Sequence, residues 1–92
     1  MKKFYAILQK SPKVEEFMKR NPEYDIISRN LTIADMKRIQ EEFPQLNLFP
    51  HPHEDVIAIT LISQVLMQNG YPKLNAYLNM KNKEILHIFV SN

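Results

Sequence analysis

The stretch EDVIAITLISQVLMQNG, residues 54–70, is the apolar centre of this sequence and decides how its fold is interpreted. Its opening is rich in β-branched residues, a composition that is typical of strands. Nothing interrupts the run between Asp55 and Gly70, however, and buried strands usually contain four to eight residues. The length therefore predicts a helix over 54–69, with Gly70 as its C-terminal cap.

As a helix, this segment would be apolar on most of its sides. Its polar line consists of Thr60, Gln64 and Gln68, and Ser63 widens that line only slightly. A helix with so little polar surface has to be covered almost all round. Because a 92-residue chain offers little cover, we expect either a fully covered central helix or a subunit interface in a homo-oligomer.

Two shorter helices are predicted before this segment. Ser11 and Pro12 suit the first positions of a helix over 12–20, which ends before a proline. Thr32 is followed three residues later by an acid, which imitates a capping box at the start of a helix over 33–43. Apolar side chains recur at helical spacing in both segments, so each helix is expected to bury one stripe.

The end of the chain alternates between apolar and polar residues and predicts a β-hairpin with strands over 74–80 and 84–90. The loop is expected at Lys81-Asn82-Lys83, where Asn82 or Lys83 accepts a left-handed conformation. The residues expected on the inner face are Leu74, Ala76, Leu78, Met80, Leu86, Ile88 and Val90.

The outer face of the predicted hairpin carries Tyr77, Ile85, His87 and Phe89, which is unusually apolar for a face in contact with solvent. Residues 3–9 fit either a strand or a helical turn, because five apolar residues in a row do not resolve the period. An N-terminal strand over 3–9 would cover the four side chains. Otherwise they form a partner-binding surface, since aromatic side chains make good anchors.

These predictions together describe an α+β fold. Three helices, over 12–20, 33–43 and 54–69, pack with the hairpin 74–80 and 84–90, with or without the N-terminal strand 3–9. The composition is that of a folded globule, with 45% hydrophobic and 24% charged residues. The length and the lack of a low-complexity linker predict one domain over 1–92.

Composition also excludes several classes of function. No cysteine is present, so disulfides, zinc fingers and thiol catalysis are excluded. One glycine in the whole chain argues against a phosphate-cradling loop. The first apolar run is too short for a secretory signal, and no stretch reaches the roughly 18 apolar residues of a membrane span. We therefore expect a cytoplasmic protein that binds no cofactor and no membrane.

The stretch FPHPHED, residues 49–55, combines two histidines with two acids, which are residue types that can bind a metal or transfer protons. His51 and His53, with His87 as the only other histidine, are candidate metal ligands, although zinc normally needs three or four ligands in a fixed geometry. The alternative interpretation is architectural. The prolines hold an extended crossing, and Glu54 and Asp55 offset the dipole at the start of the next helix.

No recognisable nucleophile motif or acid–base pair is found, so the sequence favours a non-catalytic protein that acts by protein–protein contact, as a regulator, inhibitor or adaptor. Three helices followed by a hairpin is also the order of a winged-helix DNA-binding regulator. The third predicted helix, which would enter the major groove, contains no lysine or arginine. The net charge of +2 adds no support, although six cations against two anions in the first 20 residues favour acidic partners.

Overall fold

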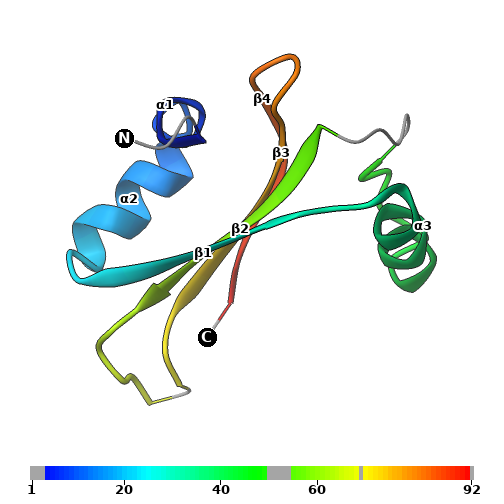
Figure 1. The fold of residues 1–92 in the computed structure, drawn as a ribbon. Helices are drawn as coiled ribbons and strands as arrows, with labels where there is room; N and C mark the ends of the chain where they lie inside the picture. The colour runs from blue at the N-terminus through cyan, green and yellow to red at the C-terminus, as the bar shows by residue number, and fades with distance from the viewer. Residues whose placement is uncertain (1–3, 50–54, 69, 92) are drawn as a thin grey trace.

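The fold is a four-stranded antiparallel sheet with helices on both of its faces (Figure 1). It is a computed structural model that describes residues 4–49, 55–68 and 70–91. The elements, in chain order, are α1 (Phe4–Leu8), α2 (Pro12–Arg20), β1 (Tyr24–Asn30), α3 (Ile33–Glu42), β2 (Val56–Ser63), β3 (Lys73–Asn79) and β4 (Glu84–Ser91). The predicted α+β class and the C-terminal hairpin are confirmed.

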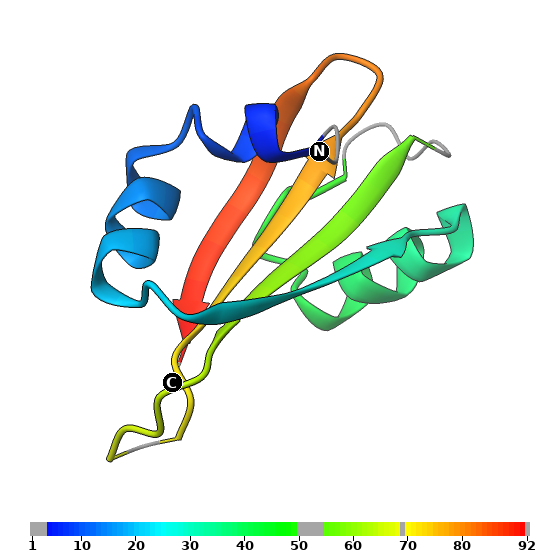
Figure 2. The ribbon, with the colours of Figure 1, turned by 60° about the vertical axis from the view of Figure 1, so that its left-hand side comes forward.

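The strands lie in the sheet in chain order, β1-β2-β3-β4, and each pairs antiparallel with its neighbour. The register places Tyr24 opposite Ser63 at one end of the β1–β2 pair and Asn30 opposite Ile57 at the other. Because α3 follows Asn30 and the β2–β3 loop follows Ser63, these two segments lie at opposite ends of the sheet. Figure 2 shows the same separation, with α3 and the loop far apart.

The helix predicted over 54–69 is wrong. Val56–Ser63 is strand β2, in the middle of the sheet, and the chain after Ser63 forms a loop. The first half of β2 is apolar without alternation because helices cover both faces of the sheet there: Ile59 packs toward α1 and α2, and Val56 packs toward α3. The length of the apolar run was misleading because the run contains a strand followed by a loop. The β-branched residues at its start indicated the strand correctly.

The N-terminal strand suggested for 3–9 is also wrong, and the helical alternative is correct. Phe4–Leu8 forms the short helix α1, in which Phe4, Ile7 and Leu8 are buried. These three residues stand at positions i, i+3 and i+4, so one helical face carries all of them. Residues 24–30, over which no element was predicted, form the edge strand β1.

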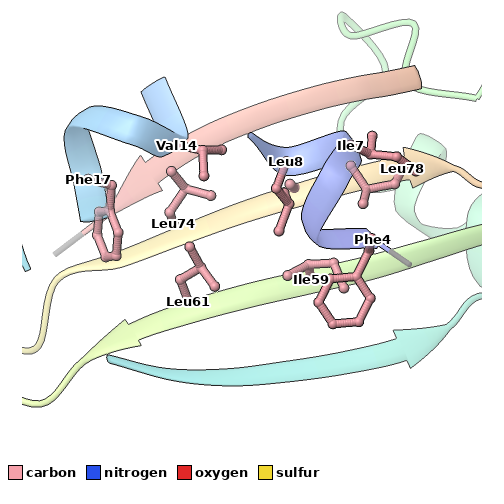
Figure 3. Packing of buried hydrophobic residues seen from close by; sticks show 10 residues of the cluster. Phe4, Ile7, Leu8, Val14, Phe17, Ile59, Leu61, Leu74 and Leu78 are labelled. Carbon is pink, nitrogen blue, oxygen red and sulfur yellow. The ribbon is translucent and has the colours of Figure 1, made fainter. Parts of the chain in front are cut away.

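The main hydrophobic core lies between the sheet and the pair α1–α2. Figure 3 shows side chains of both helices resting on β2 and β3. Leu8 and Val14 from the helices and Leu61, Leu74 and Leu78 from the strands are completely buried. We call this side of the sheet the α1–α2 face. Burying a leucine of this kind stabilises the fold by roughly 2–3 kcal/mol.

A second, smaller core lies on the opposite side, which we call the α3 face. Leu31, Met36, Leu48, Phe49 and Val56 are buried there. The predicted capping box opens α3, since Thr32 accepts a hydrogen bond from the Asp35 amide and the Asp35 carboxylate accepts one from the Thr32 amide. The Gln40 carboxamide ties the segment after α3 down by accepting from the Leu48 amide at 3.0 Å.

The hairpin differs from its prediction by one β-bulge. Lys83 has φ 54°, as expected for the loop. The register shifts between Tyr77, which pairs with His87, and Leu78, which pairs with Ile85. Leu86 is therefore an extra residue in β4, and the two neighbours exchange faces: Ile85 joins the α1–α2 core and Leu86 joins the α3 core. The prediction of Leu86 inside and Ile85 outside is wrong for this reason.

The described part of the chain is a small globule with a radius of gyration of 13.4 Å, close to the value of about 12–13 Å expected for this length. None of its helices combines the length and the apolarity needed to cross a membrane.

Candidate functional site: the open part of the α3 face

The α3 face of the sheet is covered at one end only. Met36 and Ile39 of α3, with Leu48 and Phe49, pack on the sheet near Val56. Farther from α3, large apolar side chains are exposed: Ile27 is 55% exposed and Phe89 is 41% exposed. We call this uncovered region the open face. In Figure 1 it is the side of the sheet turned away from α1 and α2, between α3 and the C-terminus.

The strand registers arrange the open face in three rows that cross all four strands, and in the row nearest α3 Ala58 and Tyr77 also pack against the edge of the α3 core. The middle row is Ile27, Thr60, Asn75 and Phe89; the row toward the β2–β3 loop is Asp25, Ile62, Lys73 and Ser91; the row toward α3 is Arg29, Ala58, Tyr77 and His87. Residues directly opposite each other on paired strands point to the same face. The open face therefore has apolar side chains at both edges of its middle row.

Three of the four residues predicted to bind a partner lie together on this face. The rings of Tyr77 and Phe89 are 6.5 Å apart, and those of His87 and Phe89 are 5.7 Å apart. Ile85, the fourth, lies on the α1–α2 face because of the bulge. The sequence missed Ile27, which could have been found only by recognising 24–30 as a strand and following its alternation.

Tyr77 forms the boundary between the covered and the open parts of the α3 face. Its ring meets the ring of the buried Phe49 edge to face, with centroids 5.2 Å apart. Burial raises the pKa of the Tyr77 hydroxyl above its usual value, and the nearby Arg29 charge opposes that shift. Tyr77 is therefore partly core, and the exposed apolar anchors are Ile27 and Phe89.

The polar side chains at the centre of the open face satisfy each other. The Thr60 hydroxyl donates a hydrogen bond to the Asn75 carboxamide oxygen at 3.0 Å. The Asp25 carboxylate accepts a hydrogen bond from the Gln64 amide group at 3.0 Å. Arg29 and Lys73 are exposed, and no ion pair of the described residues involves either. Opposite charges therefore stand at the two ends of β1, with Asp25 toward the loop and Arg29 toward α3.

The β2–β3 loop adds a second exposed apolar surface at the end of the sheet opposite α3. Val65, Leu66 and Met67 are all more than half exposed, Leu66 to 65%, and Tyr71 is exposed as well. The loop is nevertheless ordered by hydrogen bonds. Met67 and Gly70 exchange two backbone hydrogen bonds, and the Ser63 amide donates to the Pro72 carbonyl. We call the four exposed residues Val65, Leu66, Met67 and Tyr71 the loop patch.

A third group of exposed apolar residues lies at the α3 end. Ile33, Phe43 and Leu46, from the start of α3 and the segment after it, are each exposed by more than a third. We call them the α3 patch. The open face thus lies between two groups of exposed apolar residues.

A groove of about 760 Å³ lies between α2 and the loop. Phe17, Met67 and Val90 provide its apolar lining, and Lys13 and the ion-paired Glu16 and Arg20 provide its charges. The side chains of Glu16 and Arg20 are largely exposed, so the pair contributes little stability. Among the described residues of the lining, no pair of groups is suited to acid–base or nucleophilic chemistry.

Two alternative functions were predicted, metal binding by His51 and His53 and DNA binding by a winged helix. His51 and His53 lie outside the described residues, and within those that are described no group of three His, Asp or Glu residues could hold a metal ion. His87 lies on the open face, beside Phe89. The helix order that suggested a winged helix is wrong, because the third predicted helix is strand β2; DNA binding itself stays a prediction that no structural observation tests.

No protein-family model matches this chain, and no curated protein or solved structure is similar enough to it to inform its function.

Proposed function

We propose that the protein acts without catalysis, by binding another protein chain on the open face, as a cytoplasmic regulator, inhibitor or adaptor. The observation that carries the proposal is the middle row of the open face, where Ile27 and Phe89 remain exposed while Leu61, Leu74 and Leu78 on the other side of the same sheet are completely buried. Exposed apolar side chains gathered on one face typically mark a protein-interaction site.

The chemistry of this face fits a protein partner. Aromatic and aliphatic anchors at the edges, Phe89 and Ile27, are the kind of residue that dominates binding energy at interfaces. Thr60 and Asn75 between them are already hydrogen-bonded to each other, so a partner can cover them without leaving their bonded groups unsatisfied. Charged residues at the corners form the polar rim that surrounds such anchors.

The proposal is tested by placing a photo-crosslinking amino acid, p-benzoylphenylalanine, at position 89 in the native host. We expect a covalent adduct between this protein and another protein chain, which can be a second copy of itself. The matched control carries the same probe at Lys19, an exposed position on α2. No adduct from position 89, or the same adducts from both positions, would refute the proposal.

A further inference from the structure

We infer that the open face binds the open face of a second copy of this chain, about a two-fold axis that runs across the strands. This inference rests on the proposed function and names the partner. Its first support is the position of α3, which stands on the α3 face at one end of the sheet only.

The height of α3 determines how two open faces can meet. Packed sheets lie about 10 Å apart, and a helix with its side chains is about 10–12 Å across. Two copies with parallel strand directions would place both α3 helices in the same gap. A two-fold axis across the strands places them at opposite ends, each beyond the end of the other copy's open face, and the sheets can then touch between them.

The charges of the open face are complementary in this arrangement. When the axis passes over the middle row, that row faces itself and the two outer rows exchange. Asp25 then faces Arg29 of the second copy, and the symmetry makes this contact twice. In the single chain Asp25 has only Gln64 as a side-chain partner among the described hydrogen bonds, and Arg29 has no ion pair there.

The shapes of the outer rows are complementary as well. Ile62 faces the small Ala58 of the second copy, and Lys73 faces its Tyr77, which places a cation over an aromatic ring. In the middle row the apolar side chains meet their own copies, Ile27 against Ile27 and Phe89 against Phe89. An isologous interface requires self-complementarity of this kind.

The two apolar patches also become partners of each other. The loop patch and the α3 patch lie at opposite ends of each sheet, so the two-fold axis brings the loop patch of one copy to the α3 patch of the other. This matters for the area. Four strands about 4.8 Å apart and three rows about 7 Å apart present roughly 400 Å², half of the roughly 800 Å² per partner in a standard interface. An interface of standard size therefore requires the patches to be in contact as well.

The inference is tested by reversing the two charges separately in the purified protein, as Asp25→Arg and as Arg29→Asp. Sedimentation velocity should show a dimer for the wild type at a protein concentration of about 200 µM. This concentration lies above the micromolar dissociation constants of modest interfaces. Each single variant should dimerise at least about 10-fold more weakly, because like charges then face each other twice. An equimolar mixture of the two variants should form a heterodimer, because every facing pair is opposite again.

The double variant Asp25→Arg, Arg29→Asp should dimerise like the wild type, and the charge reversal Lys19→Asp on α2 should have no effect. All four variants change only exposed side chains, so the temperature of thermal unfolding should shift little. A monomeric wild type, single variants that dimerise normally, or a mixture that stays monomeric would each overturn the inference. If the wild type is monomeric but position 89 crosslinks to a different protein, the proposed function stands and only the second copy is excluded.

Discussion

Lys83 has an unusual backbone conformation, because it is the one non-glycine residue with positive φ among the described residues. A side chain with a Cβ atom is strained in this region by about 1 kcal/mol. Lys83→Gly should therefore raise the free energy of unfolding by up to about 1 kcal/mol, reduced by the greater flexibility of glycine in the unfolded chain. Urea unfolding measures this change.

The matched control is Lys81→Gly in the same loop, where φ is negative and glycine brings no relief. Lys81→Gly should be neutral or destabilising. If both substitutions have the same effect, the left-handed conformation of Lys83 is not a source of strain.

Because the Tyr77 hydroxyl is partly buried, we expect the free energy of unfolding to depend on pH in the alkaline range. Burial raises the pKa of its hydroxyl in the folded protein, so the folded state holds this proton more tightly than the unfolded state. The resulting stabilisation is complete below about pH 10, the ordinary tyrosine value, and is lost as the pH rises through the folded pKa. The Tyr77→Phe variant lacks this contribution.

The measurement compares the urea midpoints of wild type and Tyr77→Phe from pH 8 to 11. We expect the wild type to lose stability relative to the variant above pH 10. A constant difference across this range would show that folding does not raise the pKa of the Tyr77 hydroxyl.

Alternation in the sequence was a reliable guide to individual residues only up to the bulge in β4. It correctly placed Tyr77, His87 and Phe89 on one face, and Leu74 and Ala76 on the other. It misplaced Leu86, the extra residue, and Ile85, which lies between the bulge and the hairpin loop, because one extra residue reverses the faces assigned on its loop side. No local signal in the sequence marks that insertion.

At the scale of elements, helices 12–20 and 33–43 were predicted correctly to within one residue, because proline and the Thr32 cap mark their limits. The segment 54–69 was not, although it has the strongest apolar signal. Periodicity cannot distinguish a buried strand from a buried helix, and length became misleading where strand β2 continues into an apolar loop.

Two leucines of that segment separate the strand from the loop. Leu61 in β2 is 0% exposed, whereas Leu66 in the loop patch is 65% exposed. Leu61→Ala should lower the free energy of unfolding by about 2–5 kcal/mol, the range for leucines in cores. Leu66→Ala should change it by less than about 0.5 kcal/mol.

Chemical unfolding of the two variants measures both values under the same conditions. Similar losses at the two positions would mean that the loop patch is buried in the folded chain, and the account of β2 ending at Ser63 would be contradicted.

At the scale of the whole molecule, the sheet has three helices to cover two faces. The α1–α2 face receives two of them and carries the larger core, and the α3 face receives one and remains open at one end. The sequence left open whether its most apolar segment is covered within one chain or by a second subunit, and it assigned that surface to a helix over 54–69. The sequence predicted the part of the open face on β3 and β4, but not the part on β1 and β2, because those segments had not been recognised as strands.

The central claim is that the open face is a binding surface and not part of the core. The most direct measurement uses the double variant Ile27→Ser, Phe89→Ser, followed by thermal unfolding and sedimentation velocity on the same sample. We predict a free energy of unfolding within about 1 kcal/mol of the wild type, together with loss of the dimer. A variant that unfolds, or one that remains folded and dimerises like the wild type, would contradict the account.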